Sequence, residues 1–242
     1  MSSVICVLYI ALFMLAGAAD PDALYRDRDN LASAREAAGI WAARLKADPR
    51  DFESAWKLAR AQYWLGGHSP EAERRKDYEL GIEAGRQAAA IDPARPEGHF
   101  WMAANMGTLA ESFGLRQGLR YRGQIKDALE TVLKIDPTFQ RGSADRALGR
   151  WYLKVPALLG GSKRKSEEHL RKALTYNPNS TVGHFFLAET LLALDRDADA
   201  ARELETILAI PLDDPEWAPE DRDYKKKAEQ MLARLRREGR IK

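Results

Sequence analysis

The sequence predicts an all-α fold, a solenoid of about four antiparallel helix pairs with lengthened helices and a C-terminal capping helix. Three observations support this prediction. A short phrase that ends in proline recurs five times along the chain. Residues 98–103 (GHFWMA) and 183–188 (GHFFLA) are nearly identical, although they lie 85 residues apart. No stretch of the sequence sustains the polar–apolar alternation that is typical of a β-strand.

The composition is that of a protein with a core and without a strong charge. Hydrophobic residues make up 45% of the 242 residues, which is enough apolar material for a repeat-built core. The 38 Lys and Arg nearly balance the 36 Asp and Glu, which leaves a formal net charge of +2. So small a charge attracts polyanions weakly, and we expect no nucleic-acid partner. Because Cys6 is the single cysteine, an internal disulfide is excluded.

The first 19 residues differ from the rest of the chain. Residues 4–16 form an apolar run, no Lys, Arg, Asp or Glu precedes Asp20, and small residues occupy positions 16–19. The run is too short to span a ~30 Å hydrocarbon core comfortably. It predicts a signal peptide or N-terminal anchor at 1–19, a helical repeat domain at 20–242, and a periplasmic or secreted location. A start further upstream stays open because the usual basic residues are missing, and a buried helix is the less favoured alternative.

Proline sets the period of the repeat. Pro49, Pro93, Pro137, Pro178 and Pro211 are separated by 44, 44, 41 and 33 residues. Each proline lacks the N–H that a continuing helix needs and restricts the residue before it, so each is expected to end a helix. The residues eight, four and two positions before the first four prolines fall on one helical face, whereas the pattern around the fifth is offset.

A leading helix is expected after each proline. These helices begin around Trp56, His99, Ala144 and His184. Because the spacing from proline to leading helix is constant, the extra residues must lie inside each pair, as turns or as longer helices. Gly and Pro favour turns at 66–70, around 114–123 and at 155–162, and only the last pair has the regular length of ~34 residues. Residues 221–237 are rich in Lys, Arg and Glu and are expected to form a polar capping helix.

These phrases resemble the tetratricopeptide repeat (TPR), in which a bulky residue opens the first helix and small residues stand where the helices cross. The resemblance covers about residues 31–235. More narrowly, residues 99–107, 148–156 and 160–163 are similar to the T component associated with TRAP-type solute transporters. That resemblance implies a periplasmic TPR protein that partners a substrate-binding subunit and helps to pass small organic ligands to the transporter. A weaker similarity to the regulator of microtubule dynamics family, in residues 125–235, implies a shared architecture.

No catalytic or metal site is expected from the sequence. None of His68, His99, His169 and His184 has a partner at the i+3 or i+4 spacing of a helical metal site. Since His99 and His184 occupy equivalent repeat positions, packing between helices explains them best. Residues 160–163 (GGSK) lack the spacing of a phosphate loop and are expected to form a turn in which Ser162 caps the next helix. We therefore expect no metal, no cofactor and no enzymatic activity.

Residues on the leading helices are the candidates for a binding surface, because those helices line the concave face of a TPR array. Some of their aromatic side chains must pack in the core, and others would face the groove. Asn105 could offer an amide to a ligand, whereas Arg150 and Glu189 would either cap the groove or pair with each other. The candidate groove-binding residues are Trp64, Phe100, Trp101, Asn105, Arg150, Tyr152, Phe185 and Glu189.

Two functions remain open at this stage. The first is a periplasmic binding or adaptor protein that assists TRAP-type uptake of a small, hydrophobic organic ligand, which requires an enclosed apolar cavity. The alternative is a generic TPR scaffold for protein–protein interaction in the cell envelope, which requires only an open groove. An enzyme would be favoured if Glu189, Arg150 and His184 converged in a closed pocket. A protein partner is expected in both leading cases, and a homo-oligomer stays open.

Overall fold

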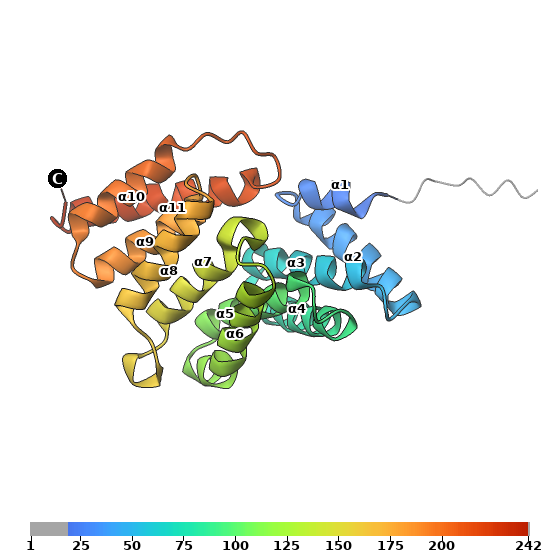
Figure 1. Cartoon of the computed structure of the whole chain (residues 1–242). Helices are drawn as coiled ribbons and strands as arrows, with labels where there is room; N and C mark the ends of the chain where they lie inside the picture. The colour runs from blue at the N-terminus through green and yellow to red at the C-terminus, as the bar shows by residue number, and fades with distance from the viewer. Residues whose placement is uncertain (1–18, 242) are drawn as a thin grey trace, which may run out of the picture.

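The computed structural model describes residues 19–241, and Figure 1 shows this part of the chain as a succession of helices without a strand. The segment expected to be a signal or anchor lies almost entirely outside the described residues. Among residues 19–241 no helix has both the length and the apolarity needed to cross a membrane. The α-helices are α1 (Pro21–Arg26), α2 (Leu31–Ala47), α3 (Phe52–His68), α4 (Glu71–Ile91), α5 (Pro96–Ser112), α6 (Leu115–Ile135), α7 (Phe139–Lys154), α8 (Lys163–Tyr176), α9 (Thr181–Ala193), α10 (Asp197–Ala209) and α11 (Ala218–Arg237).

Helices that follow each other in the sequence pack against each other in space. Helices α3 and α4, α5 and α6, α7 and α8, and α9 and α10 form four pairs, which α1 and α2 precede. Helix α11 packs on α9 and α10 and closes the C-terminal end, as Figure 1 shows. The predicted all-α solenoid of four helix pairs with a C-terminal capping helix is confirmed.

The recurring proline marks a helix end in every phrase. Each of the five helices ends two residues before a proline, because proline cannot donate to the helix and disfavours a helical residue before it. The last residues of α2, α4, α6, α8 and α10 are Ala47, Ile91, Ile135, Tyr176 and Ala209. Although the apolar pattern before Pro211 is offset, α10 also ends two residues before its proline.

Two of the three expected turns are mostly helix. Residues 66–68 complete α3. Of the three glycines expected to form the second turn, Gly118 and Gly123 lie inside α6, and only Gly114 precedes it. The extra residues lengthen α4 and α6 to 21 residues each. A glycine inside a helix costs only ~1 kcal/mol relative to alanine, and close packing offsets that cost. At Gly66 a Cβ atom would lie 2.4 Å from the ring of Tyr78, so glycine permits the close approach of α3 and α4.

The third expected turn is present at 155–162. It contains a short 3-10 helix, η1 (Ala157–Leu159), and ends at Gly160, whose φ of 100° lies in the left-handed region that favours glycine. The Oγ of Ser162 accepts a hydrogen bond from the backbone N–H of Lys165 at 3.3 Å, which confirms the predicted cap of α8. The tip of this turn is apolar and open to solvent, since Leu158 is 99% exposed.

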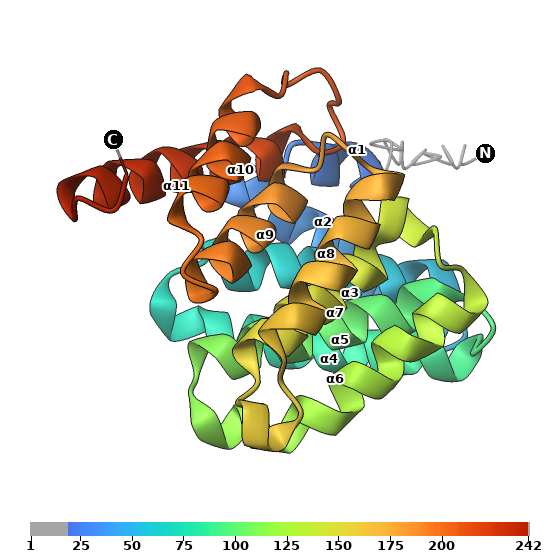
Figure 2. The same cartoon turned by 60° about the vertical axis from the view of Figure 1, so that its left-hand side comes forward.

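Polar contacts join the two ends of the array. The buried apolar residues form two clusters, one from α1 to α7 and one from α8 to α11. Polar side chains connect the two ends, and Figure 2 shows α1 beside the start of α11. We call four of these contacts the closure contacts. They are the ion pairs Arg28–Glu220, Arg60–Glu216 and Arg222–Asp29 and the contact between His68 and Asp223.

Candidate ligand-binding cavity

A partly enclosed cavity of about 1010 Å³ lies inside the array. The leading helices α3, α5 and α7 build most of its wall, and parts of α6, α9 and α11 complete it. Three residues of the closure contacts, His68, Glu220 and Asp223, also line it. Pockets for small organic molecules usually measure ~300–1,000 Å³, so this cavity has room for one such ligand.

Aromatic and aliphatic side chains form the apolar part of the wall. The ring centroid of Trp101 lies 5.6 Å from that of Tyr63 and 5.1 Å from that of Phe100. A ligand that covers these rings would remove apolar surface from water, which favours binding by ~25 cal/mol per Å². The apolar and aromatic wall residues include Tyr63, Trp64, Phe100, Trp101, Ile125, Leu129, Trp151 and Phe186.

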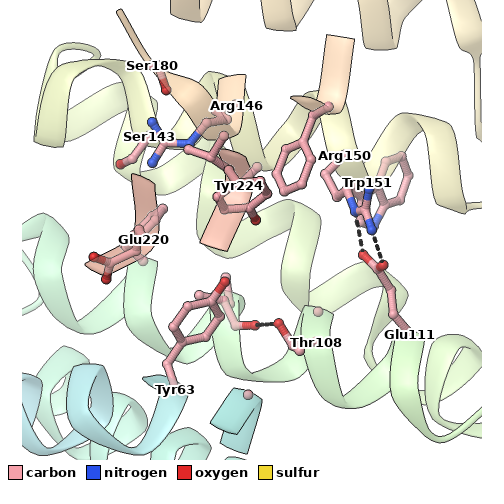
Figure 3. Close-up of a pocket in the computed structure, with 18 of the residues that line it drawn as sticks. Tyr63, Thr108, Glu111, Ser143, Arg146, Arg150, Trp151, Ser180, Glu220 and Tyr224 are labelled. Carbon is pink, nitrogen blue, oxygen red and sulfur yellow. Dashed lines mark hydrogen bonds and ion pairs between the residues drawn. The ribbon is translucent and has the colours of Figure 1, made fainter. Parts of the chain in front are cut away.

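Arg150 is held by two carboxylates from neighbouring leading helices. Its Nε and Nη2 atoms donate to Glu111 at 3.0 and 2.7 Å, and its Nη1 atom pairs with Glu189. Burial opposes the charge of Arg150, but Glu111 and Glu189 outweigh burial and raise its pKa. The guanidinium also lies 4.5 Å from the ring centroid of Phe186. Arg150 is therefore held in place and its charge is neutralised, and Figure 3 shows its contact with Glu111. Of the two roles expected for Arg150 and Glu189, the structure shows that they pair with each other.

Arg146 lies one helical turn before Arg150 on α7 and has no such partner. Among the residues that the structure describes, no acceptor hydrogen bonds to its guanidinium and no carboxylate lies within 4.0 Å of it. Burial lowers the pKa of Arg146, and the groups that act against this effect are Tyr224, Tyr63 and Glu220. Figure 3 shows Arg146 in the cavity wall. Arg146 is not among the residues predicted from the sequence, although its i, i+4 relation to Arg150 places both on one face of α7.

Two tyrosines bring hydroxyl groups to the cavity from opposite ends of the chain. Burial raises the pKa of Tyr63 on α3 and that of Tyr224 on α11. Both hydroxyls are therefore protonated at neutral pH, and each can donate as well as accept a hydrogen bond. Neither tyrosine is among the predicted groove residues, and Tyr224 belongs to the capping helix α11 rather than to a leading helix.

Four of the eight predicted groove residues line the cavity, and four do not. Those in the wall are Trp64, Phe100, Trp101 and Arg150. Outside it, Tyr152 is buried and stacks on His169 with ring centroids 5.3 Å apart. Phe185 is buried 5.4 Å from the ring centroid of Tyr224, and Glu189 supports Arg150 from behind the wall.

Asn105 is the fourth residue outside the wall, and its side chain joins helices. Its Nδ2 atom donates to the carbonyl oxygens of Ala59 at 3.0 Å and of Trp101 at 2.8 Å, and no part of the residue is exposed. A Cβ atom at Gly81 would lie 2.2 Å from the Asn105 Oδ1 atom, so glycine makes room for it on α4. Asn105 therefore ties α5 to α3 and faces its neighbours rather than the cavity.

The histidines at equivalent repeat positions bind the backbone of the preceding turn. The Nε2 atom of His99 lies 3.0 Å from the carbonyl oxygen of Pro93, and that of His184 lies 2.8 Å from the carbonyl oxygen of Pro178. The Nδ1 atom of His184 also lies 2.6 Å from Glu203. Both histidines thus tie the start of a leading helix to the proline before it, in line with the packing explanation.

The geometry that would have favoured an enzyme is not formed. Arg150 lines the cavity, but His184 and Glu189 lie outside its wall, and His184 is engaged with Glu203. Within residues 19–241 no group of three or more His, Cys, Asp or Glu side chains could hold a metal ion. What the arrangement offers is a large apolar wall, two hydroxyls and one guanidinium without a partner.

Two family models match the chain. One is described as TRAP transporter T-component and matches residues 97–237. The other is described as Regulator of microtubule dynamics protein 1-3 and matches residues 19–166. Each covers more than half of the chain. The second similarity was expected at 125–235 and lies closer to the N-terminus, because like repeats allow an array to be matched in more than one register.

The structure is similar to solved structures. A thermophilic TPR protein from Thermus thermophilus has a TM-score of 0.64 and 23% sequence identity, and the match covers 88% of this chain and 97% of that chain. A crystal structure of MamA has a TM-score of 0.49 and 16% identity, with 83% of this chain and 95% of that chain covered. Comparison with curated proteins finds no match. The likeness to the Thermus protein establishes a TPR fold. Because one fold can serve many functions, the function is inferred from the residues of the cavity.

Proposed function

Since the chain belongs to the TRAP transporter T-component family, we propose that it is a periplasmic binding and adaptor protein that holds a small organic ligand and exchanges it with the substrate-binding subunit of a TRAP-type transporter. The observation that carries this proposal is the partly enclosed, aromatic-walled cavity of about 1010 Å³. The apolar run before Asp20 supports export from the cytoplasm. Binding, rather than catalysis, is the proposed mode of action.

The closure contacts give the cavity a way to open. They join residues 28–29, just after α1, and Arg60 and His68 on α3 to residues 216–223. The two buried apolar clusters lie on either side of them, one in α1–α7 and one in α8–α11. Separating the ends of the array would therefore break polar contacts and leave both apolar clusters intact. A ligand could enter or leave by this route without unfolding of the protein.

The cavity fits a small-molecule-binding protein better than a generic TPR scaffold for protein–protein interaction. A TPR groove that binds a peptide needs an open concave face. In this protein residues 213–224 cover part of that face, and Asp213, Trp217 and Tyr224 line the cavity from the far side. Covering the groove lowers its access for a peptide and improves the burial of a small molecule.

The apolar rim of the cavity is the surface that we propose for the partner subunit. Leu158, at the tip of the 155–162 turn, is 99% exposed, and Leu119 on α6 is 52% exposed. The turn is tied to α6 because the Arg122 Nη1 atom donates to the carbonyl oxygen of Leu159 at 2.9 Å. Leu119 and Leu159 also line the cavity, so a partner at this rim would meet the ligand.

Titration calorimetry against the TRAP substrate-binding subunit of the same organism tests this proposal. Leu158→Glu is expected to weaken the complex at least ~10-fold, because it places a charge in an apolar contact. Leu80→Glu is the matched control, since Leu80 is 45% exposed on α4 and lies outside the cavity wall. No heat of binding with the native protein, or an equal loss in both variants, would contradict the proposed partner.

A further inference from the structure

The guanidinium of Arg146 lines the cavity and, among the described residues, forms no hydrogen bond or ion pair. Most other cations of the wall are engaged: Arg150 pairs with Glu111 and Glu189, Arg141 with Asp214, and Lys154 with Glu189. Arg122 donates to the carbonyl oxygen of Leu159, and Lys227 is exposed, with its ammonium 4.5 Å from the ring centroid of Tyr224. Arg146 is half-buried, and among the described residues it has neither a hydrogen-bond acceptor nor a carboxylate within 4.0 Å. Arginine stays charged under all ordinary conditions, so this charge cannot be removed by deprotonation.

A half-buried cation without a partner is costly to a folded protein. Water solvates it poorly, and the rule for buried charges is that they are paired. The nearest carboxylate that acts on Arg146 is that of Glu220. Both oxygens of Glu220 already accept hydrogen bonds from Arg28, whose side chain is 2% exposed. Glu220 is thus committed to the closure contacts and does not neutralise Arg146.

The surroundings of Arg146 favour an anion. The hydroxyls of Tyr63 and Tyr224 line the same cavity, and each can donate a hydrogen bond to an acceptor there. The amino end of α9 lines the same cavity at Ser180 and Val182, and its unpaired N–H groups carry a partial positive charge. Figure 3 shows Arg146, Tyr224, Tyr63 and Ser180 around the cavity.

We propose that Arg146 is the anion-binding residue of the cavity, and that the ligand is an amphipathic monocarboxylate. The planar fork of a guanidinium matches a carboxylate with two parallel hydrogen bonds. One unpaired guanidinium serves one carboxylate, and a second carboxylate would meet Glu111, Glu220 or Asp223 in the wall. The remainder of the ligand is apolar, because it lies against Phe100, Trp101 and the neighbouring rings. This inference rests on the proposed function, since it assumes that the cavity holds a small molecule.

The test compares two probes that differ only in the head group. Octanoate and 1-octanol are titrated by calorimetry into the full-length native protein and into Arg146→Met. Arg164→Met is the matched control, since it removes the same charge from a side chain that is 84% exposed and outside the cavity wall. Arg146→Lys keeps the charge and removes the fork. Circular dichroism and the melting temperature confirm that each variant is folded.

The native protein and Arg164→Met are expected to bind octanoate roughly 10- to 100-fold more tightly than 1-octanol, from the strength of a charge-assisted hydrogen bond. Arg146→Met is expected to lose that preference while its affinity for 1-octanol stays unchanged, and Arg146→Lys is expected to fall between. Equal affinity for both probes in every protein, or the same loss in Arg164→Met, would overturn the anion site and leave the cavity as a binding site. Binding of neither probe by the folded native protein would contradict both proposals.

Discussion

Arg28 and Glu220 are 192 residues apart in the sequence and form an ion pair in which the arginine is almost completely buried. The Arg28 Nε atom donates to the Glu220 Oε1 atom at 3.1 Å, and the Nη2 atom bonds to Oε2. The backbone carbonyl of Arg28 accepts a hydrogen bond from the Trp64 Nε1 atom at 2.8 Å, which fixes it against α3. This pair joins the turn after α1 to the start of α11, and Glu220 lines the cavity.

Arg28→Met is expected to lower the free energy of unfolding by about 3 kcal/mol. The substitution leaves the carboxylate of Glu220 buried without its partner, and removal of one member of a buried pair costs about that much. Adding Glu220→Gln to this variant is expected to recover part of the loss, because it removes the orphaned charge. Urea unfolding of the native protein, the single variant and the double variant measures both effects. Equal stability of the native protein and Arg28→Met would show that the pair does not hold the ends together.

Asn105→Ala is expected to destabilise the protein without weakening ligand binding. The change removes the two hydrogen bonds to Ala59 and Trp101 and leaves a void beside Gly81. Loss of a buried polar contact of this kind costs about 2 kcal/mol. Thermal unfolding and octanoate titration of the same sample separate the two effects. Lost binding in a variant that retains native stability would place Asn105 in the ligand site instead.

His184→Gln is expected to cost more stability at acid pH than at alkaline pH. Burial opposes the charge of His184, but Glu203 and the Pro178 carbonyl outweigh it and raise its pKa above the ordinary 6.5. A raised pKa means that the charged histidine stabilises the fold fully below about 6.5, and that this contribution is lost as the pH rises through the folded-state value. We expect the free energy of unfolding of His184→Gln to lie about 1 kcal/mol below that of the native protein at about pH 5.5, and this difference to be smaller at about pH 8.5.

His99→Gln provides the control for this pH dependence. His99 occupies the equivalent repeat position and contacts the Pro93 carbonyl, but no carboxylate of the described residues lies within ion-pair distance of it. Its deficit in urea unfolding is expected to differ little between the two pH values. The account would fail if both variants showed the same change with pH.

The repeat architecture could be predicted because it depends on local chemistry. Each of the five repeat prolines ends a helix through its own backbone chemistry, so the spacing of Pro93 and Pro137 places the ends of α4 and α6 without knowledge of their neighbours. The turns were harder to place. Gly118 and Gly123 would make a turn in isolation, yet both lie inside α6, where tertiary packing of a long helix outweighs the small cost of glycine.

The cavity could be predicted only in part, because it depends on contacts between distant residues. Arg146 and Arg150 lie one turn apart on the same face of α7. Which of them is neutralised depends on where Glu111 and Glu189 lie, and these residues belong to other repeats. Residues 213–224 are not part of a repeat, so the repeat pattern carries no information on where they pack.

Filling the cavity tests directly whether it is the ligand site. Gly107 lines the cavity on α5, and a Cβ atom built on it would meet no atom within 4 Å. Gly107→Leu therefore places a side chain in the cavity without a clash, and by helix propensity it is expected to be as stable as the native protein or slightly more so. Gly39→Leu makes the same change on α2, where a Cβ atom also meets no atom within 4 Å and the residue lies outside the cavity wall.

Native mass spectrometry of the full chain, purified without detergent and then mixed with octanoate and 1-octanol, compares these variants most directly. The native protein and Gly39→Leu are expected to carry one bound small molecule, and Gly107→Leu, which narrows the cavity, is expected to show clearly lower occupancy. Equal occupancy in Gly107→Leu and Gly39→Leu, or a native protein that carries no molecule even after the addition, would contradict the assignment of the cavity as the ligand site.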